Sequence, residues 1–118
     1  MRTILIVAAA LALSPSIGRA AKPETDAGIG AFNVCVRHTA MRLEPSGESP
    51  AAVADAAIYA CQALEVAALN LIIKDQSAGM TADDLHRTAL YYGSAAVVIA
   101  RLCRKTQDCE MANIERAH

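Results

Sequence analysis

Two short clusters of turn-forming residues divide residues 27–106 into three long stretches of helix-forming residues. The first cluster covers residues 44–50 and the second surrounds Gly79. The stretches are rich in alanine, since the chain contains 26 Ala but one Phe and no Trp. This composition favours helix over sheet. The sequence therefore predicts an all-α fold, a small antiparallel three-helix bundle in one domain. The alternative is a bundle with a short fourth helix at the C-terminus, over residues 111–118.

Local signals set the expected helix boundaries. Helices are predicted over residues 27–43, 50–76 and 82–106. Asp26 is an acceptable N-cap for the first, and Ser49 followed by Pro50 is a strong start for the second. Thr81 with Asp84 three residues later resembles a capping box for the third. Because the loops are short, we expect successive helices to be antiparallel neighbours.

The N-terminal segment has the organisation of a secretory signal peptide. A basic start is followed by an apolar run from Ile4 to Leu13, and small residues at Gly18 and Ala20 offer a cleavage site after Ala20. We predict a cleaved signal peptide over 1–20, a flexible leader over 21–26 and a single helical domain over 27–118. The alternative is an N-terminal helix of the fold. The run is too short to span a bilayer, which needs about 20 residues. A periplasmic or secreted protein with no stable membrane span is expected.

Four cysteines lie after the predicted cleavage site, as expected for an exported domain held by disulfides. With antiparallel helices, Cys35 and Cys61 are nearly level and can form a bridge. Cys103 would lie roughly 12 Å along the helix axis from Cys61, beyond the Cα separation of about 4.4–6.8 Å that a disulfide allows. Cys109 follows the third helix and can fold back on Cys103. We therefore predict the disulfides Cys35–Cys61 and Cys103–Cys109, with free buried thiols as the alternative.

Small residues recur at helical spacing on the second and third helices. The stripe on the second helix is Ala56, Ala60, Ala63 and Ala67, and that on the third is Ala89, Gly93, Ala96 and Ala100. An antiparallel hairpin would pair these stripes in register, with Ala63 opposite Gly93. We expect the two backbones to approach closely along them.

If that stripe faces inward, the opposite side of the second helix carries more large apolar residues than a three-helix core requires. These residues are Ile58, Tyr59, Val66, Leu69 and Ile73, interspersed with the polar Asp55, Gln62, Glu65 and Asn70. The third helix adds Tyr91, Val98 and Leu102 on its outer side. An exposed apolar patch on an exported protein usually marks a binding surface. The alternatives are that the C-terminal segment covers this face, or that the helix is rotated from the assumed orientation.

The chain carries no recognisable catalytic, metal or phosphate-binding motif. His38 is expected near the core, and Asp83, Asp84 and His86 at a helix start are more typical of dipole compensation than of a metal site. A net charge of −1 gives no footprint for nucleic acid. We expect no cofactor and no enzymatic activity. The predicted function is binding of a protein partner, as an inhibitor, immunity-type protein or homodimeric accessory protein. The first alternative is a carrier that holds a small apolar ligand or lipid in the bundle interior. The second alternative is a hydrolase.

Overall fold

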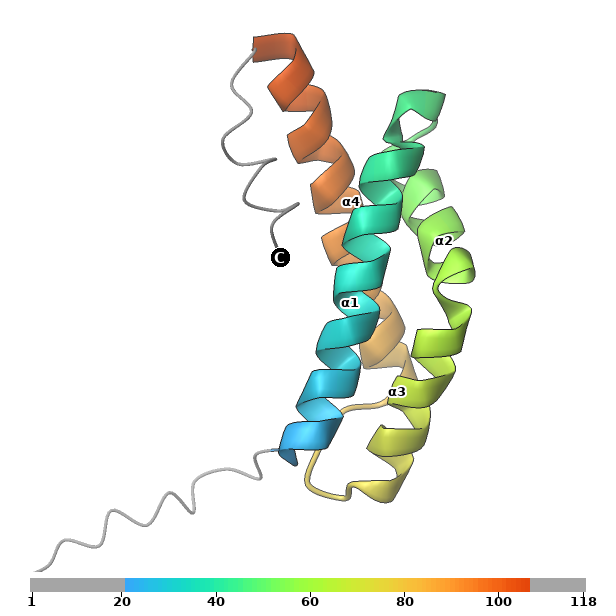
Figure 1. The fold of residues 1–118 in the computed structure, drawn as a ribbon, viewed down its shortest axis with the longest axis vertical. Helices are drawn as coiled ribbons and strands as arrows, with labels where there is room; N and C mark the ends of the chain where they lie inside the picture. The colour runs from blue at the N-terminus through green and yellow to red at the C-terminus, as the bar shows by residue number, and fades with distance from the viewer. Residues whose placement is uncertain (1–20, 107–118) are drawn as a thin grey trace, which may run out of the picture.

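The protein is all-α, and the computed structural model describes residues 21–106 (Figure 1). Its four α-helices are α1 (Pro23–Leu43), α2 (Pro50–Ala60), α3 (Gln62–Lys74) and α4 (Ala82–Thr106), and a 3₁₀ turn, η1 (Glu44–Ser46), follows α1. Helix α1 contacts the other three, α2 also packs on α4, and α3 packs mainly on α1. The predicted helical class is confirmed, and within residues 21–106 there is no strand.

Helix α1 begins at Pro23, earlier than the predicted start after Asp26. Proline suits the first turn of a helix because its missing N–H would have no intrahelical acceptor there. The segment predicted as a flexible leader is also held to the fold, because Thr25 is buried and the backbone N–H of Lys22 donates to Asp75 Oδ2 at 2.8 Å. Asp75 also accepts from the backbone N–H of Ser77 at 3.0 Å. These residues join the start of α1 to the end of α3.

Capping residues fix the starts of α2 and α4 as predicted. The Ser49 hydroxyl accepts from the Ala52 N–H at 3.2 Å, and Pro50 is the first helical residue. Thr81 and Asp84 form a reciprocal capping box: Thr81 Oγ1 accepts from the Asp84 N–H at 3.1 Å, and Asp84 Oδ2 accepts from the Thr81 N–H at 3.0 Å.

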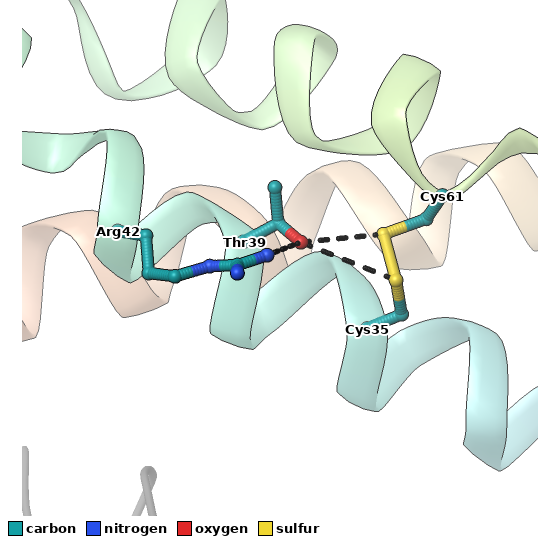
Figure 2. Close-up of a disulfide and its surroundings, with 4 residues drawn as sticks. All are labelled: Cys35, Thr39, Arg42 and Cys61. Carbon is teal, nitrogen blue, oxygen red and sulfur yellow. Dashed lines mark hydrogen bonds between the residues drawn. A yellow bond between two sulfur atoms is a disulfide. The ribbon is translucent and has the colours of Figure 1, made fainter.

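The single helix predicted over residues 50–76 is wrong, because the chain bends by 75° between α2 and α3. Cys61 is the residue at the bend, and a disulfide joins it to Cys35 of α1 with a Cα–Cα distance of 6.1 Å (Figure 2). The predicted Cys35–Cys61 pairing is thus confirmed. At this bend α3 turns onto α1 instead of continuing along α4, and the bridge holds Cys61 against α1. We call the bend around Cys61 the elbow.

The small-residue stripe on α4 is buried as predicted, but its partner stripe is not. Ala89, Gly93, Ala96 and Ala100 are all buried. On α2 and α3, Ala56, Ala60, Ala63 and Ala67 are instead exposed, and the inward positions are Val53, Ala54, Ala57, Ile58, Cys61, Ala68 and Ile72. The physical reason is that burying the larger Val and Ile side chains removes more apolar surface from water than burying alanines does. Gly93 therefore faces Ala54 and Val36, not Ala63.

A buried carboxylate connects the end of α1 to the end of α4. Glu44 in η1 is 3% exposed and forms ion pairs with Arg101, at 3.4 Å from its Nε, and with Arg104. Arg101 also donates to the carbonyl of Glu48. A buried carboxylate needs such partners, because an unpaired charge away from water is costly. The second predicted disulfide and the C-terminal helix involve residues 107–118, outside the described residues, and stay predictions.

Candidate functional site

The five residues predicted to form a partner-binding face occupy different environments. Tyr59 is 77% exposed, Val66 50% and Ile73 76%, so these three are surface residues. Leu69 is half-buried and packs against the core. Ile58 is only 5% exposed and belongs to the core. Its predicted exposure is therefore wrong, and the cause is the rotation of α2 that buries Val53 and Ile58 in place of the alanine stripe.

At the elbow is a surface hollow lined by two of these five residues, Ile58 and Tyr59. The hollow has a volume of about 220 Å³, and the residues lining it come from α2, α3 and the first turns of α4: Asp55, Ile58, Tyr59, Gln62, Glu65 and His86. Ile58, being nearly inaccessible, contributes the apolar base, while Asp55, Tyr59 and His86 are exposed around it. The hollow depends on the bend, because it lies where α3 turns away from α2.

An apolar strip on α3 continues from this hollow. Gln62, Val66, Leu69 and Ile73 follow one another at spacings of four, three and four residues, which places them on one side of the helix. We call the hollow together with Val66, Leu69 and Ile73 the elbow surface. Its polar members are acidic on balance, since the carboxylates of Asp55 and Glu65 face a single imidazole, that of His86. Such a surface suits an apolar group carried next to a positive charge.

A larger hollow of about 560 Å³ lies beside the disulfide. Its described lining comes from the second half of α1: Cys35, His38, Thr39, Met41 and Arg42. Thr39 Oγ1 is 3.5 Å from Cys61 Sγ and accepts from Arg42 Nη2 at 3.3 Å (Figure 2). The Thr39 hydroxyl thus lies against both sulfur atoms of the bridge, and Arg42 holds that hydroxyl from the other side. His38 is half-buried, at the boundary of the core.

Large apolar side chains lie in the interior of the bundle. Phe32, Val36, Leu85 and Val97 are all fully buried where α1 and α4 meet the other helices. An interior carrier site would have to displace them. Both hollows described above open at the surface instead.

Among residues 21–106, no three His, Cys, Asp or Glu side chains lie close enough to hold a metal ion. The predicted cluster at the start of α4 has a structural use, because Asp84 belongs to the capping box. Its hydrogen bonds with Thr81 lower the pKa of the Asp84 carboxyl.

Within residues 21–106, no single helix is long and apolar enough to cross a membrane. Helices α2 and α3 reach that length and apolar composition only as a pair, and the 75° bend separates them.

Comparisons with known proteins give no relative: no protein-family model, no curated protein and no solved structure matches the chain. The inference of function therefore depends on the residues of this chain alone.

Sequence reasoning placed Asp55, Gln62 and Glu65 on the correct side of the second helix but missed the contribution of His86. His86 joins the site because α4 passes the elbow at that level. No local signal marks the elbow, since the residues around Cys61 include neither proline nor glycine. The Cys35–Cys61 pairing was predicted together with an unbroken helix over residues 50–76, so the pairing did not indicate the bend either.

Proposed function

We propose that this protein is an exported, non-catalytic binding protein that contacts a partner protein through the elbow surface. The observation that carries the proposal is the exposure of Tyr59, which is more than three-quarters accessible, at a hollow with the buried Ile58 at its base. Ile73, which is also more than three-quarters accessible, ends the apolar strip that runs from this hollow along α3. Large apolar side chains gathered around a concavity are typical of binding surfaces. An aromatic residue at the rim is well suited to anchor a contact.

The polar residues of the elbow surface define the partner chemistry. Asp55 and Glu65 leave the hollow acidic. A complementary segment would insert an aliphatic or aromatic side chain above Ile58 and place a lysine or arginine near each carboxylate. Electrostatic complementarity of this kind contributes mainly to specificity and association rate, whereas the apolar contact contributes most of the affinity.

Export is supported by the predicted signal peptide and by the disulfide. The Cys35–Cys61 bridge is compatible with an oxidising compartment such as the periplasm or the cell exterior. An inhibitor, an immunity-type protein or an accessory subunit would each fit this location. All three act by occupying a surface of another protein.

The test compares two lysine substitutions on neighbouring exposed residues of α3. Val66→Lys places a charge in the elbow surface, where it would repel a basic partner and remain desolvated under it. Ala67→Lys is the matched control, because Ala67 is also exposed but points to another side of α3. Wild-type protein and both variants are isolated from the exported fraction of the native host, and the complexes are measured by native mass spectrometry.

We expect wild type and Ala67→Lys to retain the same partner and Val66→Lys to lose it, with unchanged circular dichroism for all three. A partner retained equally by Val66→Lys would overturn the elbow surface as the site. A monomer that instead carries extractable lipid in all three proteins would favour the carrier.

A further inference from the structure

The outer side of α4 is a second apolar surface, separate from the elbow surface. Tyr91 is 70% exposed, Val98 44% and Leu102 53%. Together with the half-buried Ala95 they follow at spacings of four, three and four residues, opposite the buried stripe of small residues. We call Tyr91, Ala95, Val98 and Leu102 the α4 seam. This alternation of four and three is the spacing of a coiled-coil contact.

Charged residues of opposite sign end the seam. Asp84, Tyr91, Val98 and Lys105 are each seven residues apart, so they lie on one side of the helix. A helix that packs antiparallel on this side therefore meets an acidic residue at one end and a basic residue at the other. A parallel copy would instead bring Asp84 next to Asp84 and Lys105 next to Lys105.

From this pattern we infer that the protein forms a homodimer in which the α4 seams of two copies pack antiparallel. The symmetric register places Tyr91 opposite Leu102 of the second copy and Ala95 opposite Val98 of the second copy. Lys105 then lies level with Thr88 of the second copy, four residues or about 6 Å along the helix axis from Asp84 of that copy. The long lysine side chain spans this offset, and charge complementarity favours this orientation over the parallel one. The small side chain of Ala95 allows the two backbones to approach closely near the two-fold axis. One surface meets itself, as a two-fold dimer requires.

The dimer leaves the elbow surface open, since α1 and α2 meet α4 at Gly93, in the buried stripe on the opposite side of α4 from the seam. Each dimer would present two elbow surfaces. A partner with repeated binding segments would then be held more tightly than by one copy.

The test measures the molecular mass of the exported full chain by sedimentation velocity at micromolar to millimolar concentration. We expect twice the chain mass for wild type and the chain mass for Val98→Asp. Val66→Asp, on the elbow surface, is the matched control and should stay dimeric, which separates this inference from the proposed partner site. A wild type that is monomeric throughout, or a Val98→Asp variant that stays dimeric, would overturn the inference.

Charge pairs test the orientation. Tyr91→Lys and Leu102→Glu should each give monomers, because each places a charge opposite an apolar residue. The double variant should recover the dimer at low salt, since the introduced lysine of one copy then faces the introduced glutamate of the other. In a parallel dimer the double variant would place like charges together and stay monomeric, and that result would overturn the antiparallel arrangement.

Discussion

Gly93 of α4 lies so close to Ala54 of α2 that a Cβ atom on Gly93 would be 2.9 Å from the Ala54 Cβ. It would also be 3.0 Å from Val36 Cγ1 of α1. Three helices therefore meet at a position where only a hydrogen atom fits. The glycine has a packing role that outweighs its low helix propensity.

Replacing Gly93 by alanine should consequently destabilise the protein by about 1–3 kcal/mol, the usual cost of overpacking a core. The Ala54 Cβ is fixed to its backbone, so the helices must move apart. Gly30→Ala is the matched control, because an added Cβ at that position has no neighbour within 4 Å. It should stabilise α1 by about 0.5–1 kcal/mol through helix propensity. Urea denaturation measures both, and a Gly93→Ala variant as stable as wild type would contradict the close approach.

The elbow disulfide should be a large contributor to stability. The double variant Cys35→Ala/Cys61→Ala removes a cross-link between residues 26 apart in sequence. The loss of loop constraint in the unfolded chain predicts a fall of about 3.5 kcal/mol in the free energy of unfolding. Equilibrium denaturation of the variant and wild type, both oxidised, checks this value. A much smaller fall would indicate that the packing of α3 on α1 holds the elbow without the bridge.

Asp75 should make the junction of α1 and α3 sensitive to acid. Hydrogen bonds from Ser77 and from the backbone N–H of Lys22 lower the pKa of the Asp75 carboxyl well below its ordinary value of 3.8. A carboxyl whose pKa is depressed in the folded state stabilises the fold above its unfolded pKa, and this stabilisation is lost as the pH falls through the folded value. The melting temperature should therefore decrease as the pH falls below about 3.8. Asp75→Asn should be less stable than wild type at neutral pH and should show a weaker decrease. Parallel melting curves against pH for the two proteins would contradict this role.

The parts of the fold that sequence reasoning predicted are governed by local chemistry or by register. The Ser49 and Thr81 hydroxyls cap their helices by accepting from the backbone N–H three residues later, so the helix starts are visible in the sequence. The Cys35–Cys61 pairing follows from the register of two antiparallel helices. The burial of the stripe on α4 was predictable from the helical spacing of its small residues.

The orientation of α2 and the elbow depend on tertiary contacts and were not predictable in the same way. The small-residue stripe on the second helix suggested the wrong inward face, because helices α1 and α4 bury Val53 and Ile58 in preference to alanines. This error placed Ile58 on the surface. The bend has no local signal, and the hollow that it forms with His86 exists only once α3 has turned onto α1.

Ile72 and Ile73 provide a direct test of how α3 is oriented. The two residues are adjacent and chemically identical, but Ile72 is 8% exposed and Ile73 76% exposed. Ile72→Ala should cost about 2–5 kcal/mol, because it removes buried methyl groups and leaves a cavity. Ile73→Ala should change stability by less than about 0.5 kcal/mol, as is usual for surface positions. Chemical denaturation of the pair gives the comparison, with each variant the control for the other. If Ile73→Ala were the more damaging change, α3 would be rotated from this orientation, and Ile73 would not be available to a partner.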